Sequence, residues 1–243
     1  MSLARQAALC FNSTVTTSDK NPRNLSVVVL GASGAVGGAA LQALEAMPKV
    51  VRITLLGRRV LPGLSSKAAQ HVVDVFDAKA YQTHLAGHDA AICTFGVGES
   101  SKVSHEEFTR VDKTAVLNFA AACKTAGVRH YELLSSVSAD AKSASFYLRT
   151  KGEINDALAA LNFERLSLFQ PSMILTPSNR YGLSQAITLA VWPHLKPALL
   201  GPLRKYRGIP VAQLGAAMVK NLFTSGAGVE HLSWDEFKAL TAG

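Results

Sequence analysis

Residues 25–37 decide the fold and read Leu-Ser-Val-Val-Val-Leu-Gly-Ala-Ser-Gly-Ala-Val-Gly. The apolar run over 25–30 predicts a buried strand, and the pattern over 35–47 predicts a helix that ends at Pro48. Between them stand the glycines Gly31, Gly34 and Gly37. Glycines there permit a tight turn, and the unpaired N–H groups at the start of the helix can hold a pyrophosphate. The stretch therefore predicts the first strand, turn and helix of a dinucleotide-binding domain.

Short apolar runs and longer helical patterns alternate along the rest of the chain, which is typical of a parallel sheet covered by helices on both faces. We expect further strands over 51–56, 71–75, 89–95, 130–134 and 163–169. We expect further helices over 78–85, 104–127, 147–161 and 211–223, and a short last helix capped by Ser233 and Glu236. The sequence thus predicts an α/β fold, a doubly wound parallel β-sheet of the Rossmann type.

The chain is expected to form one domain over residues 25–243, preceded by an N-terminal extension over 1–24. The less regular C-terminal third is expected to form a small cap over the ends of the strands. Within it, residues 176–210 would contribute to the substrate site.

The composition is that of a globular protein, because 48% of the 243 residues are hydrophobic and only 17% are charged. The three cysteines form no Cys-x-x-Cys pair, and the seven histidines form no His-Glu-x-x-His pattern. We therefore expect neither a disulfide framework nor a metal site. No apolar run approaches the roughly 20 residues of a membrane helix, so we expect no transmembrane segment.

The formal net charge of +8 fits a nucleic acid, an acidic membrane surface or a small anionic ligand. No recognition motif and no interleaving of aromatic with basic residues accompanies the charge, so we expect no nucleic-acid partner. Arg204, Lys205 and Arg207 form a basic group near the C-terminus. That group is either a solvated face or a surface for a protein partner.

The end of the second predicted strand indicates which cofactor binds. A carboxylate at this point accepts hydrogen bonds from an adenosine 2′-hydroxyl, whereas arginine suits a 2′-phosphate. Here the strand ends in Gly57-Arg58-Arg59, with no Asp or Glu. Because a guanidinium fork matches phosphate oxygens, the sequence favours NADP(H) over NAD(H). The alternative is two solvated arginines on a turn.

Tyr147 and Lys151 lie four residues apart on a predicted helix, where the ammonium can favour the phenolate over the phenol. A tyrosine needs such support to act as an acid near neutral pH. This spacing alone is common by chance. However, Ser135 and Ser136 follow the strand over 130–134, at the edge where open α/β sheets bind ligands, and a hydroxyl there can hydrogen-bond a substrate carbonyl.

These motifs resemble, in their order, those of the short-chain dehydrogenase/reductase superfamily. More narrowly, the chain resembles the atypical NAD(P)-binding Rossmann members of the Tat-interacting-protein branch, the CC3-like oxidoreductases, over about residues 25–175. The points of similarity are Gly-Ala-Ser-Gly (31–34), Leu-Leu-Gly-Arg-Arg (55–59), Gly-His-Asp (87–89), Arg-Val-Asp (110–112), Leu-Leu-Ser-Ser (133–136) and Tyr-Leu-x-x-Lys-Gly-Glu (147–153). Ile-Pro-Val (209–211) is a weaker point of similarity.

The resemblance implies bound NADP(H). The residues of the glycine turn would hold the pyrophosphate, namely Gly31, Ser33, Gly34, Ala35, Val36 and Gly37. The adenosine half would lie against Arg58 and Arg59 at the 2′-phosphate, Asp74 and Val75 near adenine, and Thr94, Phe95 and Gly96 along the ribose and phosphates. The nicotinamide half would lie against Lys151 at the ribose and Pro171, Met173 and Ile174 beside the ring.

The implied catalytic residues are Ser136, Tyr147 and Lys151, and Ser136 matches the position of the superfamily serine better than Ser135 does. The chain departs from the pattern of its relatives at two places. Gln-Pro-Ser over 170–172 replaces a common Arg-Pro-Gly, and Val137 replaces a lysine. Both departures concern the substrate side.

We expect an oxidoreductase that uses NADPH to reduce a carbonyl or an activated double bond of a small, hydrophobic or acidic substrate. The alternative is a catalytically weak NADPH sensor that acts through protein–protein interaction, because members of the branch are also described as regulators.

The N-terminal extension bears on the location of the protein. It contains Arg5, Lys20 and Arg23 but only one acid, Asp19. We expect it to be a tail of a cytoplasmic protein, and the alternative is a transit peptide of a mitochondrial one.

Overall fold

The computed structural model of the chain describes residues 24–176 and 199–242. The N-terminal extension, except for Asn24, and most of the expected cap over 176–210 lie outside the described residues.

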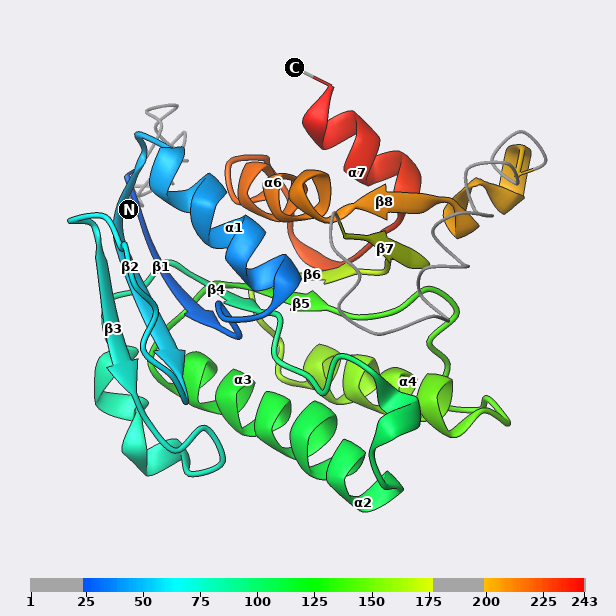
Figure 1. Ribbon diagram of the computed structural model, residues 1–243, viewed down its shortest axis with the longest axis horizontal. Helices are drawn as coiled ribbons and strands as arrows, with labels where there is room; N and C mark the ends of the chain where they lie inside the picture. Colours follow the sequence, from blue (N-terminus) through cyan, green and yellow to red (C-terminus); the bar gives the residue numbers. More distant parts are fainter. Residues whose placement is uncertain (1–23, 177–198, 243) are drawn as a thin grey trace, which may run out of the picture.

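A seven-stranded parallel sheet forms the centre of the molecule (Figure 1). Its strands are β1 (Leu25–Leu30), β2 (Val50–Gly57), β3 (Ala68–Val72), β4 (Ala90–Cys93), β5 (His130–Leu134), β6 (Arg165–Phe169) and β9 (Gly228–Leu232). Their order is β3-β2-β1-β4-β5-β6-β9, and every neighbouring pair is parallel. This order is that of a Rossmann sheet with one more strand at the β6 edge, and it confirms the predicted fold class.

Helices cover both faces of the sheet (Figure 1). On one face lie α1 (Ala35–Ala46), α6 (Val211–Asn221) and α7 (Trp234–Thr241). On the other lie α3 (Ala115–Thr125) and α4 (Phe146–Ala160). A short helix, α2 (His105–Phe108), and a π-helical turn, η4 (Thr109–Thr114), lead directly into α3.

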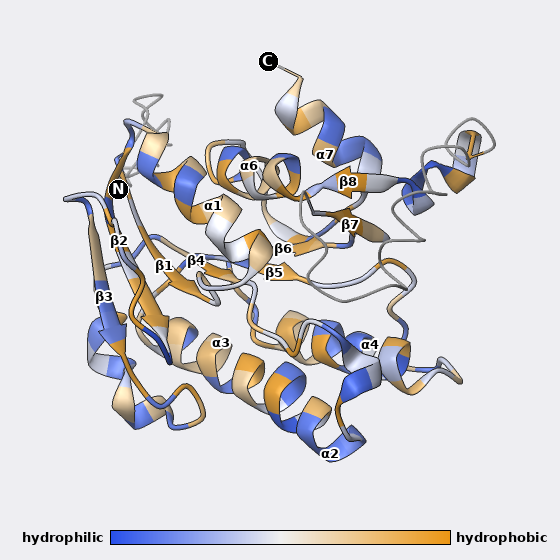
Figure 2. Cartoon of the chain, viewed as in Figure 1, coloured by the Kyte–Doolittle hydropathy of each residue, from blue (hydrophilic) through white to orange (hydrophobic). Residues whose placement is uncertain are grey.

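Strand β1 shows why the apolar run in the sequence is unbroken. Val27 and Val29 pack into the core under α1 and α6, whereas Val28 and Leu30 pack into the core on the side of α3. Successive side chains of a strand point to opposite faces, so a strand with helices on both sides must be apolar throughout. The strands are accordingly among the most hydrophobic segments in Figure 2.

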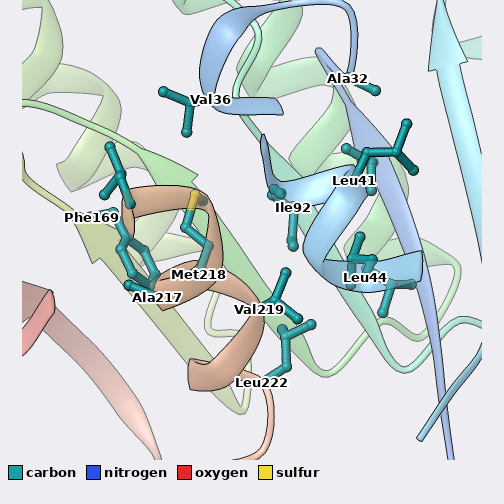
Figure 3. Packing of buried hydrophobic residues seen from close by; sticks show 14 of the residues in the cluster. Ala32, Val36, Leu41, Leu44, Ile92, Phe169, Ala217, Met218, Val219 and Leu222 are labelled. Atoms are coloured by element: carbon teal, nitrogen blue, oxygen red, sulfur yellow. The ribbon is translucent and has the colours of Figure 1, made fainter. Parts of the chain in front are cut away.

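Helices α1 and α6 pack closely against each other on one face of the sheet, over β4 (Figure 3). Figure 3 shows Leu41 and Leu44 of α1 and Val219 of α6 gathered around Ile92. Gly215 of α6 makes this contact possible, because a Cβ on it would lie 2.6 Å from the backbone nitrogen of Ala40.

Two boundary predictions were wrong. The third strand spans Ala68–Val72 instead of 71–75, and the error arises because none of its residues is fully buried, so no apolar run marks it. The helix expected over 78–85 is instead two 3₁₀ turns, η1 (Ala78–Ala80) and η2 (Gln82–His84). Only Tyr81 and Leu85 of that segment reach the core, which is too short an apolar stripe to hold an α-helix.

The C-terminal third is not, as expected, a cap alone. From Val211 onward it completes the sheet through β9 and one helical layer through α6 and α7. Its described part before that comprises the 3₁₀ segment η6 (Gly201–Tyr206) and β8 (Gly208–Pro210), which pairs with β7 (Met173–Leu175) as a separate two-stranded sheet.

Within residues 24–176 and 199–242, no helix has the length and apolar character needed to cross a membrane. The same residues contain no group of three or more His, Cys, Asp or Glu side chains that could hold a metal ion. Cys93 and Cys123 are free thiols buried in the core, and Cys10 lies outside the described residues.

Candidate cofactor and reaction site

The glycine turn joins the end of β1 to the end of β4. Gly31 has φ of +100°, and a Cβ on it would lie 2.6 Å from the backbone nitrogen of Phe95. The Thr94 hydroxyl donates a hydrogen bond of 3.2 Å to the Gly31 carbonyl oxygen. A Cβ on Gly37 would overlap that same carbonyl oxygen. Both glycines are therefore required by close packing of the turn itself.

The first turn of α1 is available to an anion. Its N-cap is Gly34, so no side chain accepts hydrogen bonds from the N–H groups that follow, and the turn contains no acidic residue. Helix N-termini with uncapped N–H groups favour phosphate. The turn thus provides the cradle that a dinucleotide pyrophosphate requires.

Arg58 and Arg59 lie in different surroundings at the tip of β2. Arg59 lines a pocket that the glycine turn also borders, with the lining residues Ala32, Ser33, Leu55, Leu56, Gly57, Arg59, Leu61, Gln70 and His71. The guanidinium carbon of Arg58 instead lies 5.6 Å from the centre of the Phe95 ring. The two arginines therefore have different neighbours in the structure, and their joint role at a 2′-phosphate stays a prediction.

Beside Arg58 the expected contact Phe95 meets a second ring, Phe76, which the sequence did not indicate. The Phe76 and Phe95 rings meet edge to face with centres 6.3 Å apart, and Arg110 lies 4.0 Å over the Phe76 ring. The Asp74 carboxylate accepts a hydrogen bond from the backbone N–H of Phe76. The Val75 side chain is fully buried in the core, so only its backbone remains for an adenine ring.

The two serines after β5 differ in their partners. The Ser135 hydroxyl donates a hydrogen bond of 2.8 Å to the side chain of Asn155 in the protein interior. The Ser136 hydroxyl makes only a long 3.3 Å hydrogen bond to the carbonyl oxygen of its neighbour Val137. Ser136 is thus the serine whose hydroxyl is more readily given to a ligand.

Tyr147 and Lys151 occupy the first half of α4, which begins after the N-cap Ser145. Tyr147 is half-buried against the Phe108 ring, and Lys151 is buried, with 7% of its surface exposed. Burial acts to lower the pKa of Lys151, but the Asp112 carboxylate and Tyr147 outweigh it and hold this pKa above its usual value. The ammonium therefore stays charged beside the phenol.

Asp112 is a second residue of the site that the sequence analysis did not single out. Its carboxylate lies 2.9 Å from the Lys151 ammonium, and only 4% of Asp112 is exposed. Arg-Val-Asp over 110–112 is only a point of family similarity in the sequence, and no local pattern indicates an ion pair between residues this far apart in the chain.

The loops after β5 and β6 lie together. The backbone N–H of Val137 donates a hydrogen bond of 3.1 Å to the carbonyl oxygen of Pro171. Met173 and Ile174 follow in β7 and pair with Gly208 and Ile209 of β8. The expected nicotinamide neighbours thus adjoin the loop that carries Ser136.

The loop that follows Ser136 also meets a phenol. The hydroxyls of Ser138 and Tyr206 lie 3.3 Å apart, and Ser138 adopts the left-handed backbone conformation, with φ of +59°. The hydrogen bond from Ser138 and the nearby Lys205 ammonium lower the pKa of Tyr206. The Ser138 hydroxyl, the Tyr206 phenol and the Lys205 ammonium therefore lie close together beside this loop.

The sequence-predicted residues follow the C-terminal ends of β1 to β6, apart from Tyr147 and Lys151, which are on α4. Because all strands are parallel, the strand ends share one edge of the sheet.

Comparison with known proteins identifies the family of the chain. A family model described as NAD(P)H-binding matches residues 31–164. The rat protein named HTATIP2 is 32% identical over 213 residues, which is 86% of either chain. The protein named FMP52, mitochondrial, from Candida albicans is 28% identical over 175 residues, 69% of this chain and 76% of that one.

Solved structures share the fold. MoeE5, in complex with UDP-glucuronic acid and NAD, superposes with a TM-score of 0.67 at 17% identity, covering 89% of this chain and 82% of that one. A UDP-N-acetylglucosamine 4-epimerase from Methanobrevibacter ruminantium has a TM-score of 0.65 at 14% identity, covering 87% and 77%.

Proposed function

Because the chain belongs to the NAD(P)H-binding Rossmann family and to the relatives of HTATIP2 within it, we propose that it is an NADPH-dependent oxidoreductase that reduces a carbonyl or an activated double bond of a small molecule. The observation that carries the proposal is the buried Lys151 beside Tyr147, at the same edge of the sheet as Ser136, whose hydroxyl makes only a long hydrogen bond to Val137.

The shape of the cofactor region fits a dinucleotide. The turn excludes a Cβ at Gly31 and Gly37, and the uncapped first turn of α1 offers N–H groups to a pyrophosphate. Arg59 borders a small hollow beside the glycine turn, and a guanidinium there is the type of group that binds a further phosphate at the adenosine end. These features support NADP(H) as the cofactor.

When bound, NADPH supplies the hydride. Tyr147 is assigned the proton that the substrate oxygen takes up, since its phenol lies near the charged Lys151 at the edge of the sheet where the other candidate residues lie. Ser136 is assigned the hydrogen bond to that oxygen as negative charge develops on it. Ser135 is unsuited to this role because its hydroxyl already serves Asn155.

The rim of the site supports a substrate that carries an acidic group. Lys205 and Tyr206 lie beside the loop that follows Ser136, joined to it through Ser138. An ammonium and two hydroxyls can receive a carboxylate or a phosphate. We expect keto acids to be reduced with lower KM than their methyl esters, as measured by NADPH absorbance.

Replacing Tyr147 by Phe tests the assigned proton donor. NADPH binding should survive, while turnover should fall by roughly 10²- to 10⁴-fold, the usual effect of one positioned acid. Calorimetry measures the binding, and NADPH absorbance measures the turnover. Tyr81→Phe is the matched control, because its hydroxyl is buried in the core without a hydrogen-bond partner. A Tyr147→Phe protein that turns over at the native rate would exclude this mechanism.

A second candidate is an NADPH sensor that acts by binding a protein partner. The name of the rat relative, a Tat-interacting protein, favours it, together with the exposed Arg204 and Lys205 of η6. The two candidates differ in turnover. A native protein that binds NADPH tightly but reduces no member of a broad carbonyl panel is the sensor.

The location of the protein has two candidates. The cytoplasmic expectation rested on the N-terminal segment being a tail. The mitochondrial names of the fungal relatives support the alternative. Mass spectrometry of the endogenous N-terminus in separated cell fractions distinguishes them: a chain beginning between Thr14 and Asn24 in mitochondria indicates a cleaved transit peptide, and a chain that retains Met1 or Ser2 in the cytosol indicates the tail.

A further inference from the structure

The 3₁₀ segment η6 has two ridges of different character. A 3₁₀-helix has three residues per turn, so side chains three positions apart lie on the same side. Arg204 and Arg207 are such a pair, and their guanidinium carbons lie 5.4 and 4.8 Å from the centre of the Trp234 ring. Leu200, the N-cap, and Leu203 are the neighbouring pair with this spacing. The segment therefore has a basic ridge that packs on α7 and an apolar ridge beside it.

The basic ridge fixes η6 to the body of the protein. Arg204 forms an ion pair with Asp235 of α7. The Trp234 indole donates a hydrogen bond of 3.2 Å to the carbonyl oxygen of Gly208, just after η6. Helix α7 is in turn anchored in the core by Phe237, which is fully buried. A segment held in this way presents its other ridge in a fixed direction.

The apolar ridge is exposed. Leu200 has 64% of its surface exposed and Leu203 has 49%. Six large hydrophobic residues are exposed in the described part of the chain, and only these two stand within one turn of each other. The orange segment before β8 projects from the side of the molecule opposite β3 in Figure 1, and Figure 2 shows hydrophobic next to hydrophilic residues along it. The two leucines therefore form a continuous apolar strip, unlike hydrophobic residues that are scattered singly.

Cationic side chains flank this strip. Lys205 is exposed, and Arg204 keeps 45% of its side chain exposed although it pairs with Asp235. The formal net charge of +8 adds a field that attracts anionic surfaces. Tyr206 stands three residues after Leu203 and continues the apolar ridge, and tyrosines are enriched where lipid meets water. Leucines, a tyrosine and cations in one short segment are typical of a contact with an anionic lipid surface.

The size of the strip favours a membrane over a protein partner. A stable protein interface involves roughly 20–30 residues on each side around a well-packed centre. The ridge of η6 offers three side chains in a row, with cations beside them. A bilayer requires no complementary shape, because a few apolar side chains enter its interface while neighbouring basic residues contact the anionic head groups.

We propose that η6 binds the surface of an anionic membrane: its two exposed leucines enter the bilayer interface, and its cationic side chains contact the lipid head groups. The Tyr206 hydroxyl lies 3.3 Å from that of Ser138, in the loop that follows Ser136. The docked protein therefore turns this side of the candidate reaction site toward the membrane. The proposal goes beyond the proposed function and depends neither on turnover nor on the cofactor.

Co-sedimentation of the full chain with lipid vesicles tests the proposal. The vesicles contain phosphatidylcholine alone or phosphatidylcholine with about one-third phosphatidylserine, at an ionic strength of about 0.15 M. The native protein should bind the anionic vesicles at least about tenfold more tightly than the neutral ones, because each basic residue near such a surface contributes roughly a fivefold gain. At about 1 M salt this preference should be largely lost.

Variants of η6 separate the apolar from the cationic contribution. Leu200→Ser combined with Leu203→Ser leaves every charge in place and should weaken binding to anionic vesicles by at least about tenfold. Lys205→Gln should weaken it by roughly fivefold and leave binding to neutral vesicles unchanged. Val51→Ser combined with Val229→Ser is the matched control, because these valines are also exposed but lie outside η6. This control should bind vesicles as the native protein does.

The outcomes differ clearly. Loss of binding in the double-leucine variant but not in the double-valine control, with the midpoint of thermal unfolding unchanged, supports the proposal. A native protein that binds neither kind of vesicle overturns it and leaves η6 to the protein partner of the sensor candidate. Equal binding by the native protein and the double-leucine variant also overturns it, because another part of the chain then carries the binding. An equal loss in both double variants overturns the assignment to η6 as well.

Discussion

The two arginines at the tip of β2 are adjacent in sequence but have different neighbours in the structure. Arg59 borders the pocket beside the glycine turn, and Arg58 lies over Phe95. A phosphate in that pocket would be present on NADPH and absent from NADH, whereas an adenine beside Phe95 is common to both. The neighbours should therefore affect cofactor affinity in different ways.

Single substitutions separate these roles. The native protein should bind NADPH at least about tenfold more tightly than NADH, a difference of about 1.4 kcal/mol. Arg59→Ala should remove most of this preference, and Arg58→Ala should weaken both cofactors by a similar factor. Calorimetric titration of both cofactors measures the two ratios. An unchanged ratio in Arg59→Ala would show that the pocket does not receive the 2′-phosphate.

At this scale the sequence predicted most residues of the candidate site but not their neighbours. The glycines, arginines and serines at strand ends could be predicted from the sequence, because each follows directly after a predicted strand. Asp112 was not predictable, since its partner Lys151 is 39 residues away. The distinction between Ser135 and Ser136 in turn depends on Asn155, one helix later.

Helices α1 and α6 show how elements from opposite ends of the chain fix the cofactor turn. Helix α1 begins at the glycine turn, and α6 packs against it through Gly215. A Cβ added to Gly215 would lie only 2.6 Å from the backbone nitrogen of Ala40. Gly38 on α1 also stands inside a helix, but a Cβ there would meet its nearest atom at an ordinary 3.5 Å. The two glycines are therefore chemically alike and sterically different.

Alanine at these two positions should change stability in opposite directions. Gly215→Ala should destabilise the protein by about 1–3 kcal/mol, the usual cost of overpacking. Gly38→Ala should stabilise it by about 0.5–1 kcal/mol, since alanine suits a helix interior better than glycine. Urea unfolding of the three proteins measures both effects. An unaffected Gly215→Ala would contradict the packing of α1 against α6, and a destabilised Gly38→Ala would contradict the space found at Gly38.

Buried elements could be predicted from the sequence, whereas edge elements could not. The central strands are apolar on both faces and so stand out as unbroken runs. Strand β9 was missed because, at the edge of the sheet, only Leu232 of its residues is buried. The same cause displaced the predicted bounds of the other edge strand, β3.

The whole molecule contains a polar network within its core, joining β5, β6, β9 and α6. Glu132 is fully buried and accepts a hydrogen bond from Asn221, which also bonds Ser167. Arg165 lies in the same network and pairs with Glu230. Burial raises the pKa of Glu132 well above its usual 4.5, so the folded protein retains a proton that the unfolded chain releases.

The stability of the protein should therefore depend on pH through Glu132. Its contribution is full below about pH 4.5 and is lost as the pH rises through the raised pKa, by at most about 1.4 kcal/mol per pH unit. Glu132→Gln lacks this loss, so its free energy of unfolding relative to the native protein should increase from pH 5 upward. Urea unfolding at several pH values measures the difference, and parallel curves would refute a protonated Glu132.

His130, beside Glu132, does not produce this difference. Burial lowers its pKa to about 3, with Arg165 adding to the effect. A lowered pKa removes stability as the pH falls from about 6.5, the opposite direction. Because both proteins retain His130, its effect cancels to first order in the comparison.

The place of β9 also has a consequence for how the protein is made. Strand β6 is synthesised well before β9, the strand that pairs with its outer edge, because Arg165 of β6 pairs with a residue 65 positions later. At bacterial or eukaryotic translation speeds of about 5–20 residues per second, this wait lasts roughly 3–13 s. During that time a nascent chain on the ribosome presents the bare edge of β6 to its surroundings. Every strand that carries an expected cofactor contact is synthesised before β9. The nascent protein would therefore be able to bind its cofactor before the last strand joins the sheet.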